Sequence, residues 1–427
     1  MRDMLCALVC IILLTIGTAT GADATLQSQL KDPDLSAHWI YDDLTKAMAE
    51  AKAAGKPICV ELRCVPCPPG KKLDGEVTHP DADLEKLEKN FVCVRVVQTN
   101  GLDQKLFQYD YDQSVAFMFL NADGTIYGRY ATRNGPKERA DEYLSPASFR
   151  KSMERALELH KGYPANKEAL KGKQGGTPPY RVPEEIPGLT DKPHVATAPV
   201  NCIHCHMVKE AVLHAKWSEK KLQASDIYTF PMPNNVGITV DAEDGLRIKS
   251  VAPDSPAAKA GLAAGDELVT LNGQPLISVA DIQWVLNGLP DESKLTAQVL
   301  RSGKTVEQTL SLNGEWRHSD LTWRRSVRAL HYGLFFEALT ADAKTKRGIP
   351  AGDLALNVKF LVAQRAEPVI KAGLKVGDVI LAVDGKTSMI PGTEIFVNLH
   401  LTHGPGESFK VTILRGSERK ELTLPMW

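Results

Sequence analysis

Five consecutive residues near the middle of the chain, from Cys202 to His206, bring together two thiols and two imidazoles. Cys202 and Cys205 are separated by two residues and His206 follows directly, which gives the spacing C-x-x-C-H. Two thiols at this spacing can close a disulfide, supply half of a zinc site, or add across the two vinyl groups of a haem. Because no second C-x-x-C lies nearby to complete a four-thiolate zinc site, we favour haem, with His206 as the proximal ligand of the iron.

This motif resembles that of c-type cytochromes, and the resemblance implies a haem c bound by the two cysteines and His206. The segment before the next domain is too short to enclose a haem, so a neighbouring domain would have to complete the pocket. Met232 lies between two prolines that would present its thioether from a fixed loop, and we predict it as the second axial ligand. His194 is the alternative, while His204 is predicted to lie on the surface.

A second pair of thiols with the same spacing, Cys64 and Cys67, follows the strand-like run 58–63. The pattern over residues 38–160 is helix, strand with C-x-x-C, helix, strand, hairpin and helix. This order resembles the thioredoxin-like superfamily, which implies a redox role for the pair. Three features depart from that family: Pro68-Pro69-Gly70 follows directly, Arg63 replaces an aromatic residue, and no proline stands near Val115. We therefore predict a structural or sensing disulfide with little reductase turnover, and keep an active, weak thiol-disulfide oxidoreductase as the alternative.

A glycine-containing pattern occurs twice in the second half of the chain. Residues 259–268 read KAGLAAGDEL and residues 371–380 read KAGLKVGDVI, and strand-like runs surround both copies. In each copy Ala-Gly-Leu closes a short helix and Gly-Asp turns into the next strand. Both copies resemble the bacterial PDZ domains that are attached to secreted serine proteases.

In such domains a peptide C-terminus adds as a strand to the sheet edge, and backbone amides of a glycine loop hold its carboxylate. The resemblance implies protein C-termini as partners; the alternative is that one or both copies only pack against other domains. We find no nucleophile motif and no Ser/His/Asp arrangement, so we predict that the chain is not a protease. The predicted peptide-binding residues are Tyr332, Gly333, Leu334 and Phe335 in the second copy, and Val236, Gly237 and Ile238 in the first.

The remaining segments complete a multidomain chain of α/β and β-rich class. Residues 1–22 read as a signal peptide, which predicts an exported, periplasmic or secreted protein with no transmembrane segment after cleavage. The net charge of -1 offers nothing that would attract nucleic acid. We expect the following order: thioredoxin-like domain 38–160, Pro/Gly-rich linker 161–200, helical CxxCH segment 201–230, PDZ domain 231–315, Trp/Arg connector 316–330 and PDZ domain 331–427.

Three functions are consistent with these features. The first is an exported haem-binding redox or sensor scaffold whose PDZ domains dock protein C-termini. The second is a thiol-disulfide oxidoreductase that uses Cys64 and Cys67 on partners recruited by the PDZ domains. The third is a non-redox PDZ adaptor in which the cysteine pairs are structural. We favour the first, and expect a redox partner for either of the first two.

Overall fold

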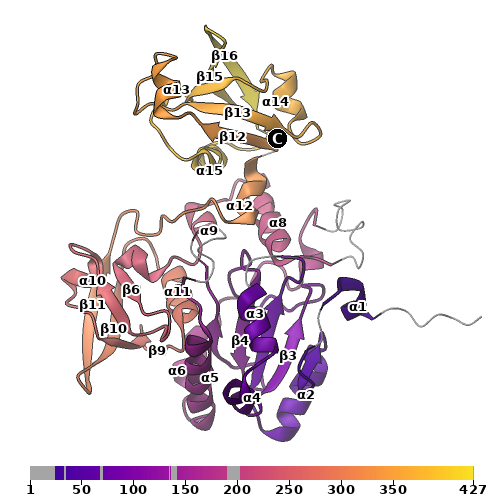
Figure 1. Cartoon of the computed structure of the whole chain (residues 1–427), viewed down its shortest axis with the longest axis vertical. Helices are drawn as coiled ribbons and strands as arrows, with labels where there is room; N and C mark the ends of the chain where they lie inside the picture. Colours follow the sequence, from indigo (N-terminus) through magenta and orange to yellow (C-terminus); the bar gives the residue numbers. More distant parts are fainter. Residues whose placement is uncertain are drawn as a thin grey trace, which may run out of the picture.

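The computed structural model describes residues 25–32, 35–67, 71–133, 135, 142–189, 202–331 and 333–426. The predicted signal peptide, His194 and Tyr332 lie outside these residues. Figure 1 shows three sheet-containing regions, with the second PDZ copy joined to the rest through α12 and α8. No helix in the described ranges is both long and apolar enough to cross a bilayer.

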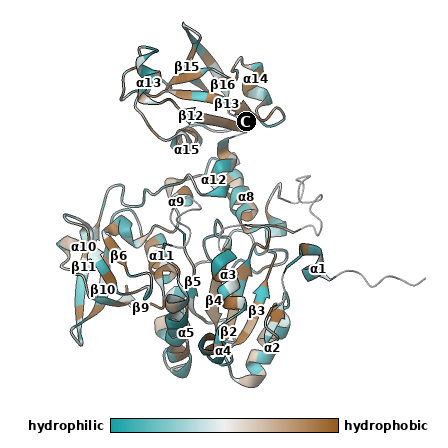
Figure 2. Ribbon diagram, in the orientation of Figure 1, coloured by the Kyte–Doolittle hydropathy of each residue, from teal (hydrophilic) through white to brown (hydrophobic). Residues whose placement is uncertain are grey.

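The thioredoxin-like domain is built on a five-stranded sheet in the order β1-β3-β2-β4-β5. β1 and β2 each pair with β3 in the parallel direction, whereas β4 pairs antiparallel with both of its neighbours, β2 and β5. The central strands are apolar and buried on both faces, because helices cover the sheet on either side (Figures 1 and 2). The strands are β1 (Trp39–Tyr41), β2 (Ile58–Arg63), β3 (Val92–Val96), β4 (Val115–Leu120) and β5 (Ile126–Tyr130).

The helices of this domain begin and end where the sequence supplies capping residues. Asp43 caps α2 and Gly55 ends it in the left-handed conformation, with φ 62°. Ser145 forms a capping box with Ser148 at the start of α5, and a proline occupies the first turn. The helices are α1 (Leu26–Leu30), α2 (Leu44–Ala54), α3 (Lys71–Thr78), α4 (Ala82–Glu88) and α5 (Pro146–Lys161).

The described part of the predicted linker, residues 161–189, contains short helices, which corrects the expectation of an extended segment there. It forms α6 (Lys167–Leu170), η2 (Lys171–Lys173) and η3 (Pro183–Glu185). Leu170 is buried in the core of the thioredoxin-like domain, and the Lys173 ammonium lies 2.7 Å from the Asp281 carboxylate of the first PDZ copy. Burial of these side chains holds the segment against the two domains, although its sequence has no periodic pattern.

The CxxCH segment continues into α8 (Cys205–Ser218), followed by α9 (Ala224–Ile227). His204 is the N-cap residue of α8, and Cys205 is its first residue. The predicted helix at this position is therefore present. Its C-terminal part packs against the second PDZ copy, because Trp217 is buried in the core of that domain and its indole N–H donates to the His403 carbonyl at 2.8 Å.

The first PDZ copy contains a four-stranded sheet in the order β11-β10-β8-β9 and a two-stranded sheet of β6 and β7. Its single long helix, α11, lies against β5 of the thioredoxin-like domain (Figure 1). Its elements are η4 (Pro233–Val236), β6 (Ile238–Val240), β7 (Ile248–Val251), α10 (Pro256–Lys259), β8 (Glu267–Leu271), β9 (Gln274–Pro275), α11 (Val279–Asn287), β10 (Ser293–Arg301) and β11 (Lys304–Leu312).

The second PDZ copy forms a five-stranded antiparallel sheet in the order β12-β13-β14-β15-β16, so β12 is an edge strand. α12 (Arg325–Arg328) and η5 (Ala329–His331) lead into it from the connector. Its elements are β12 (Leu334–Ala338), α13 (Ala341–Thr345), β13 (Leu356–Leu361), α14 (Glu367–Lys371), β14 (Val379–Val383), α15 (Gly392–Thr402), β15 (Ser408–Arg415) and β16 (Glu418–Pro425).

Candidate functional site

The Cys64–Cys67 pair forms a disulfide in a turn that follows β2 directly. The buried side chain of Arg63 holds this turn, because its guanidinium donates to the carbonyls of Cys64, Cys67 and Ser114. Its Nε also lies 2.7 Å from the Asp74 carboxylate, which balances the buried charge. The residue that replaces the expected aromatic side chain therefore fixes the geometry of the disulfide turn.

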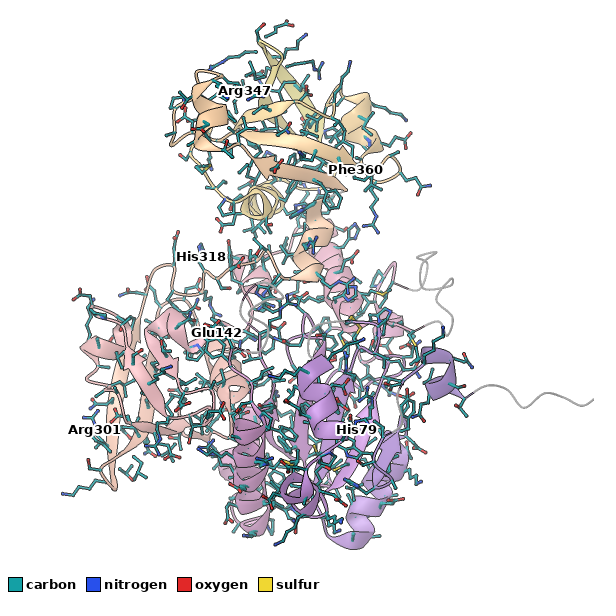
Figure 3. The ribbon with its side chains drawn as sticks, in the orientation of Figure 1. His79, Glu142, Arg301, His318, Arg347 and Phe360 are labelled. Atoms are coloured by element: carbon teal, nitrogen blue, oxygen red, sulfur yellow. A yellow bond between two sulfur atoms is a disulfide. The ribbon has the colours of Figure 1, made fainter. Side chains whose placement is uncertain are left out.

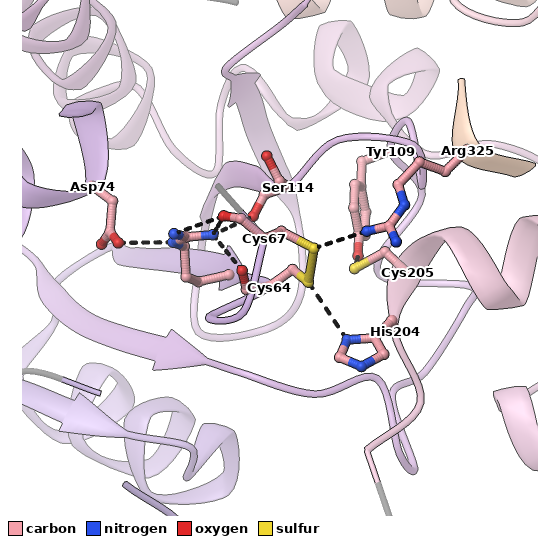
Figure 4. The surroundings of a disulfide bond; sticks show 9 residues. Cys64, Cys67, Asp74, Tyr109, Ser114, His204, Cys205 and Arg325 are labelled. Carbon is pink, nitrogen blue, oxygen red and sulfur yellow. Dashed lines mark hydrogen bonds and ion pairs between the residues drawn. A yellow bond between two sulfur atoms is a disulfide. The ribbon is translucent and has the colours of Figure 1, made fainter. Parts of the chain in front are cut away.

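The second C-x-x-C loop lies beside this disulfide, although 140 residues separate His204 from Cys64. Hydrogen bonds to the end of the β3 region hold the loop: Thr99 N–H donates to the Ile203 carbonyl at 3.1 Å, and Ile203 N–H donates to Asn100 Oδ1 at 2.7 Å. The His204 ring then reaches the disulfide, its Nδ1 lying 3.4 Å from Cys64 Sγ (Figure 4). His204 was predicted to lie on the surface, and that expectation is wrong.

Cys202 and Cys205 are free thiols in this structure, and both are buried. The Tyr109 hydroxyl donates to Cys205 Sγ at 3.0 Å, in the apolar core beneath the sheet (Figure 4). Burial raises the pKa of Cys205, and it raises the pKa of Cys202 to about 11. Both groups are therefore thiols at neutral pH.

An arginine from the connector completes the surroundings of the disulfide. The Arg325 guanidinium Nη1 lies 3.4 Å from Cys67 Sγ, so each sulfur of the disulfide has a nitrogen partner (Figure 4). The neighbouring Arg324 is buried against the thioredoxin-like domain, with Nη1 2.9 Å from the Asp110 carboxylate. Arg324 also lies 4.5 Å from the centre of the Trp323 ring. The contact with Cys67 was missed because it depends on residues far apart in the chain.

A pocket of about 570 Å³ opens at this junction of the thioredoxin-like domain, the CxxCH segment and the second PDZ copy. Cys67 and Cys202 line it, together with His206 from α8. The rings of His204 and His206 stack with centroids 5.9 Å apart. Among the described residues that line the pocket are three arginines, Arg325, Arg328 and Arg365, and one carboxylate, that of Glu210. The pocket therefore favours an anionic ligand.

The geometry of the CxxCH segment does not suit a covalently bound haem. The attached cofactor requires both thiols to face one space of porphyrin size. Cys202 lines the 570 Å³ pocket, whereas Cys205 lines a separate cavity of only about 10 Å³. Among the described residues, no group of three or more His, Cys, Asp or Glu side chains is arranged to hold a metal ion.

Met232, the predicted axial ligand, is buried in the core of the first PDZ copy. Its Sδ accepts hydrogen bonds from Thr132 Oγ1 at 3.4 Å and from Gln283 Nε2 at 3.1 Å. The thioether is thus used in packing between the PDZ copy and the thioredoxin-like domain. The structure does not bring it together with His206.

The predicted peptide-binding loop of the second PDZ copy lies at the edge of the 570 Å³ pocket. Gly333 has φ 77°, Leu334 is buried in the domain core, and the Phe335 side chain is 46% exposed and lines the pocket. The loop continues into β12, the edge strand of the sheet. The pocket therefore lies between the predicted peptide-binding loop of the second PDZ copy and the disulfide of the thioredoxin-like domain.

In the first PDZ copy the predicted residues Val236 and Ile238 are buried in the domain core, and Gly237 adopts φ 92°. The α11 helix, which would border a bound peptide, is held by other parts of the chain. Its Asp281 carboxylate accepts from the Arg129 backbone N–H of β5 at 3.1 Å. This copy is integrated into the rest of the molecule.

Comparison with known proteins identifies the domains. A family profile described as PDZ domain matches residues 235–312 and 348–426, and one described as thioredoxin-like matches residues 39–122. The chain carries a thioredoxin-like domain and two PDZ domains. The predicted fold class is thereby confirmed, as are the thioredoxin-like and PDZ parts of the predicted resemblance.

The curated relatives are periplasmic proteases. The periplasmic serine endoprotease DegP of Escherichia coli K12 is 33% identical over 145 residues, covering 34% of this chain and 27% of the relative. A probable periplasmic serine endoprotease, DegP-like, of Marinomonas is 32% identical over 149 residues, covering 34% of this chain and 30% of the relative. Among solved structures, the serine endoprotease of Yersinia pestis is 25% identical, covering 24% of this chain and 35% of that chain, with a TM-score of 0.20.

These relatives correct three expectations. They are named as serine endoproteases, which contradicts a haem redox or sensor scaffold, the haem cofactor, and the expectation that the chain is not a protease. Their periplasmic location confirms the predicted localisation of an exported protein. The chain spans between a quarter and a third of the length of the two curated relatives, so their whole activity is not carried over as a finding.

Proposed function

We propose that this chain serves proteolysis in the periplasm by capturing the C-terminal ends of polypeptides in its second PDZ domain. The names of the relatives support a role in proteolysis. The observation that carries the proposal is the position of the carboxylate loop, which opens onto a pocket with three arginines. The whole arrangement would hold an anionic chain end beside an edge strand.

The backbone of the loop is suited to binding a carboxylate. Gly333 has φ 77°, and a Cβ at this position would lie 2.9 Å from the Cβ atoms of both Arg365 and Val362. Glycine therefore lets the backbone approach these two residues closely. Backbone N–H groups in such a loop can converge on a carboxylate, and the edge strand β12 can pair with the extended peptide that precedes it.

Arginines, and not histidine, supply the positive charge at this loop. Arg328 and Arg365 line the pocket and bring two guanidinium groups to this loop. Burial lowers the pKa of His331 to about 4, so its ring is neutral at pH 7. Its buried Nε2 has no hydrogen-bond partner among the described residues, which leaves it available to a bound ligand.

An apolar surface beside the loop indicates which kind of last residue a bound peptide should have. Phe336 stacks on Phe396 of α15, with ring centroids 5.5 Å apart, and His331 stacks on Phe396 at 4.8 Å. Phe335 and Phe360 are 46% and 58% exposed, and their ring centroids are 6.1 Å apart. Figure 3 shows Phe360 on the second PDZ copy. We therefore expect peptides with an apolar last residue to bind best.

The test is fluorescence anisotropy with a labelled peptide that ends in an apolar residue. Amidation of its C-terminus should weaken binding at least about tenfold, which corresponds to about 1.4 kcal/mol. Arg328→Gln and Arg365→Gln should weaken the free-acid peptide and have less effect on the amidated one. The matched control is Arg347→Gln, because Arg347 is exposed beyond α13 and away from the pocket (Figure 3). Equal affinity for the two peptides would show that the loop does not bind carboxylates.

The same samples test proteolysis. Peptide and protein would be incubated together and followed by mass spectrometry, with a serine-directed fluorophosphonate probe in a parallel sample. Cleavage together with labelling of the chain would assign hydrolysis to this chain. Binding without cleavage would restrict its part in proteolysis to capture of polypeptide ends.

A further inference from the structure

We propose that the two C-x-x-C pairs form one redox unit, in which the Cys202 and Cys205 thiols exchange with the Cys64–Cys67 disulfide inside the folded chain. The fold provides this juxtaposition, because the pairs belong to separate segments of the sequence and neither motif indicates the other. The exchange needs no recruited polypeptide. It is therefore independent of the peptide-binding function proposed above.

The four sulfurs share the same two cavities. Cys67 and Cys202 both line the 570 Å³ pocket, and Cys64 and Cys205 both line the small cavity of about 10 Å³ behind it. His204, inside the second motif, contacts Cys64 Sγ directly at 3.4 Å (Figure 4). Each of the two cavities is thus bordered by one cysteine from each pair.

The surroundings favour exchange within the chain over exchange with large external thiols. Cys64, Cys67, Cys202 and Cys205 are only 5%, 6%, 3% and 8% exposed. Reaction between groups held in one site is favoured over reaction between separate molecules, because the translational entropy has already been lost. Hydrogen bonds from Thr99 to the Ile203 carbonyl keep the second loop against the first domain.

The polar groups around the sulfurs set the direction of electron transfer. Arg325 and His204 can stabilise the thiolates that form when Cys67 and Cys64 are released. Cys205 accepts a hydrogen bond from the Tyr109 hydroxyl at 3.0 Å, yet burial still raises the pKa of both Cys202 and Cys205. Thiols that are stabilised as thiolates leave readily and favour the reduced state of their pair. Electrons are therefore expected to pass from Cys202 and Cys205 to the Cys64–Cys67 disulfide.

The exchange balances without an outside oxidant or reductant. One thiol of the second pair loses its proton, and the resulting thiolate attacks one sulfur of the Cys64–Cys67 bond. A mixed disulfide forms, and the other sulfur is released as a thiolate that takes up a proton. The remaining thiol of the second pair loses its proton and attacks its neighbour in the mixed disulfide. The products are a Cys202–Cys205 disulfide and two thiols at Cys64 and Cys67, after the transfer of two electrons and two protons.

The sequence makes the exchange convenient to follow by mass spectrometry. Cys64 and Cys67 lie between Arg63 and Lys71, so trypsin releases both in one peptide. Cys202 and Cys205 share a different tryptic peptide that ends at Lys209. A disulfide within a pair leaves the peptides separate, whereas a mixed disulfide joins them. The buried thiols Cys59 and Cys93 serve as internal controls that should not change.

In the first experiment the full chain is reduced, desalted and given one equivalent of oxidised glutathione. Samples are quenched with N-ethylmaleimide and their peptides are mapped over time. Once glutathione has oxidised Cys64 and Cys67, the Cys202–Cys205 disulfide should form from the Cys64–Cys67 disulfide at a rate that does not depend on protein concentration. The Cys64→Ser/Cys67→Ser double variant should form it several-fold more slowly. A second pair that stays reduced, or that oxidises equally fast in the double variant, would overturn the proposal.

The second experiment traps the intermediate. In Cys67→Ser the remaining Cys64 should join the tryptic peptide of Cys202 and Cys205 under a glutathione redox buffer, and Cys93→Ser should give no such cross-link. Failure of folded Cys67→Ser to form the joined peptide would contradict the exchange. If this variant does not fold, the wild-type time course decides the question, because a wild-type second pair that remains reduced is sufficient to reject the proposal.

Discussion

The guanidinium of Arg324 and the carboxylate of Asp110 form a buried ion pair across 214 residues, with Nη1 2.9 Å from each carboxylate oxygen. The same guanidinium donates to the Thr229 carbonyl at 2.6 Å, and the next connector residue but one, Ser326, donates its N–H to the Asp112 carboxylate at 2.9 Å. The connector between the PDZ domains is therefore attached to the thioredoxin-like domain. This attachment places Arg325 over the disulfide.

Loss of this ion pair should destabilise the junction strongly. Arg324→Met leaves the Asp110 and Asp112 carboxylates buried without their main cation, which costs about 3–5 kcal/mol for a pair of this kind. The free energy of unfolding would be measured by urea denaturation. The control is Lys46→Met, because Lys46 pairs with Glu50 on the surface and such pairs contribute at most about 1 kcal/mol. A similar decrease in the free energy of unfolding in both variants would show that the buried pair stabilises the chain no more than a surface pair does.

Gly128 in β5 is the point where the first PDZ copy approaches the thioredoxin-like sheet. A Cβ added there would overlap the Ile277 side chain and lie 2.6 Å from Asp281 Oδ2. Gly128→Ala should therefore separate the two domains or destabilise the chain by about 1–3 kcal/mol. Limited proteolysis and urea denaturation would measure the change. Gly75→Ala, in the middle of α3 where a Cβ meets nothing within 4 Å, should not increase proteolysis and should not lower the free energy of unfolding.

Gly237 and Gly265 have nearly equal φ angles, so their alanine variants distinguish backbone strain from a side-chain collision. Gly237 has φ 92° and a Cβ there would overlap the Ser255 side chain, whereas Gly265 has φ 90° and open space around it. Both alanine variants suffer backbone strain of about 1–2 kcal/mol, but only Gly237→Ala adds the collision. Thermal unfolding should show a clearly larger loss for Gly237→Ala. Equal losses would mean that Ser255 moves aside without cost.

Acid should weaken the second PDZ domain through buried imidazoles. Burial lowers the pKa of His400 to about 4, below its ordinary value of 6.5, and the ring donates from Nδ1 to the Phe396 carbonyl at 2.7 Å. Between pH 6.5 and 4 the unfolded chain binds a proton that the folded chain does not, so stability falls as the pH falls. The contribution of His400 between pH 7 and 4.5 is roughly 2 kcal/mol.

The measurement is the free energy of unfolding in urea at pH 7 and pH 4.5. His400→Gln removes the titrating group and should reduce the loss on acidification, while His331, whose pKa burial also lowers to about 4, retains its own part. His79→Gln is the control, because His79 lies exposed at the end of α3 (Figure 3). An unchanged acid loss in His400→Gln would assign the pH dependence to other groups.

Local patterns in the sequence were enough to predict most elements and all three domains. The β2 strand was predicted over 58–63 and forms there, and the order of helices and strands predicted over 38–160 is present. α2 ends at Gly55 and α5 begins after Ser145, both residues with local end signals. These features depend on residues close together in the chain, such as apolar periodicity, caps and left-handed glycines. The repeated glycine pattern likewise identified the PDZ copies, since the turns of each copy are local.

The chemistry of the cysteines could not be predicted from such patterns. Cys-Ile-His-Cys-His is compatible with a haem, a zinc half-site or a free dithiol, and the sequence alone does not state what lies beside it. Only the tertiary structure places Cys205 under Tyr109, His204 against Cys64 and Arg325 against Cys67. Each of these contacts joins residues that are more than 90 positions apart. The sequence determined the domains because their signals are local, whereas packing between domains decided which side chains surround each sulfur.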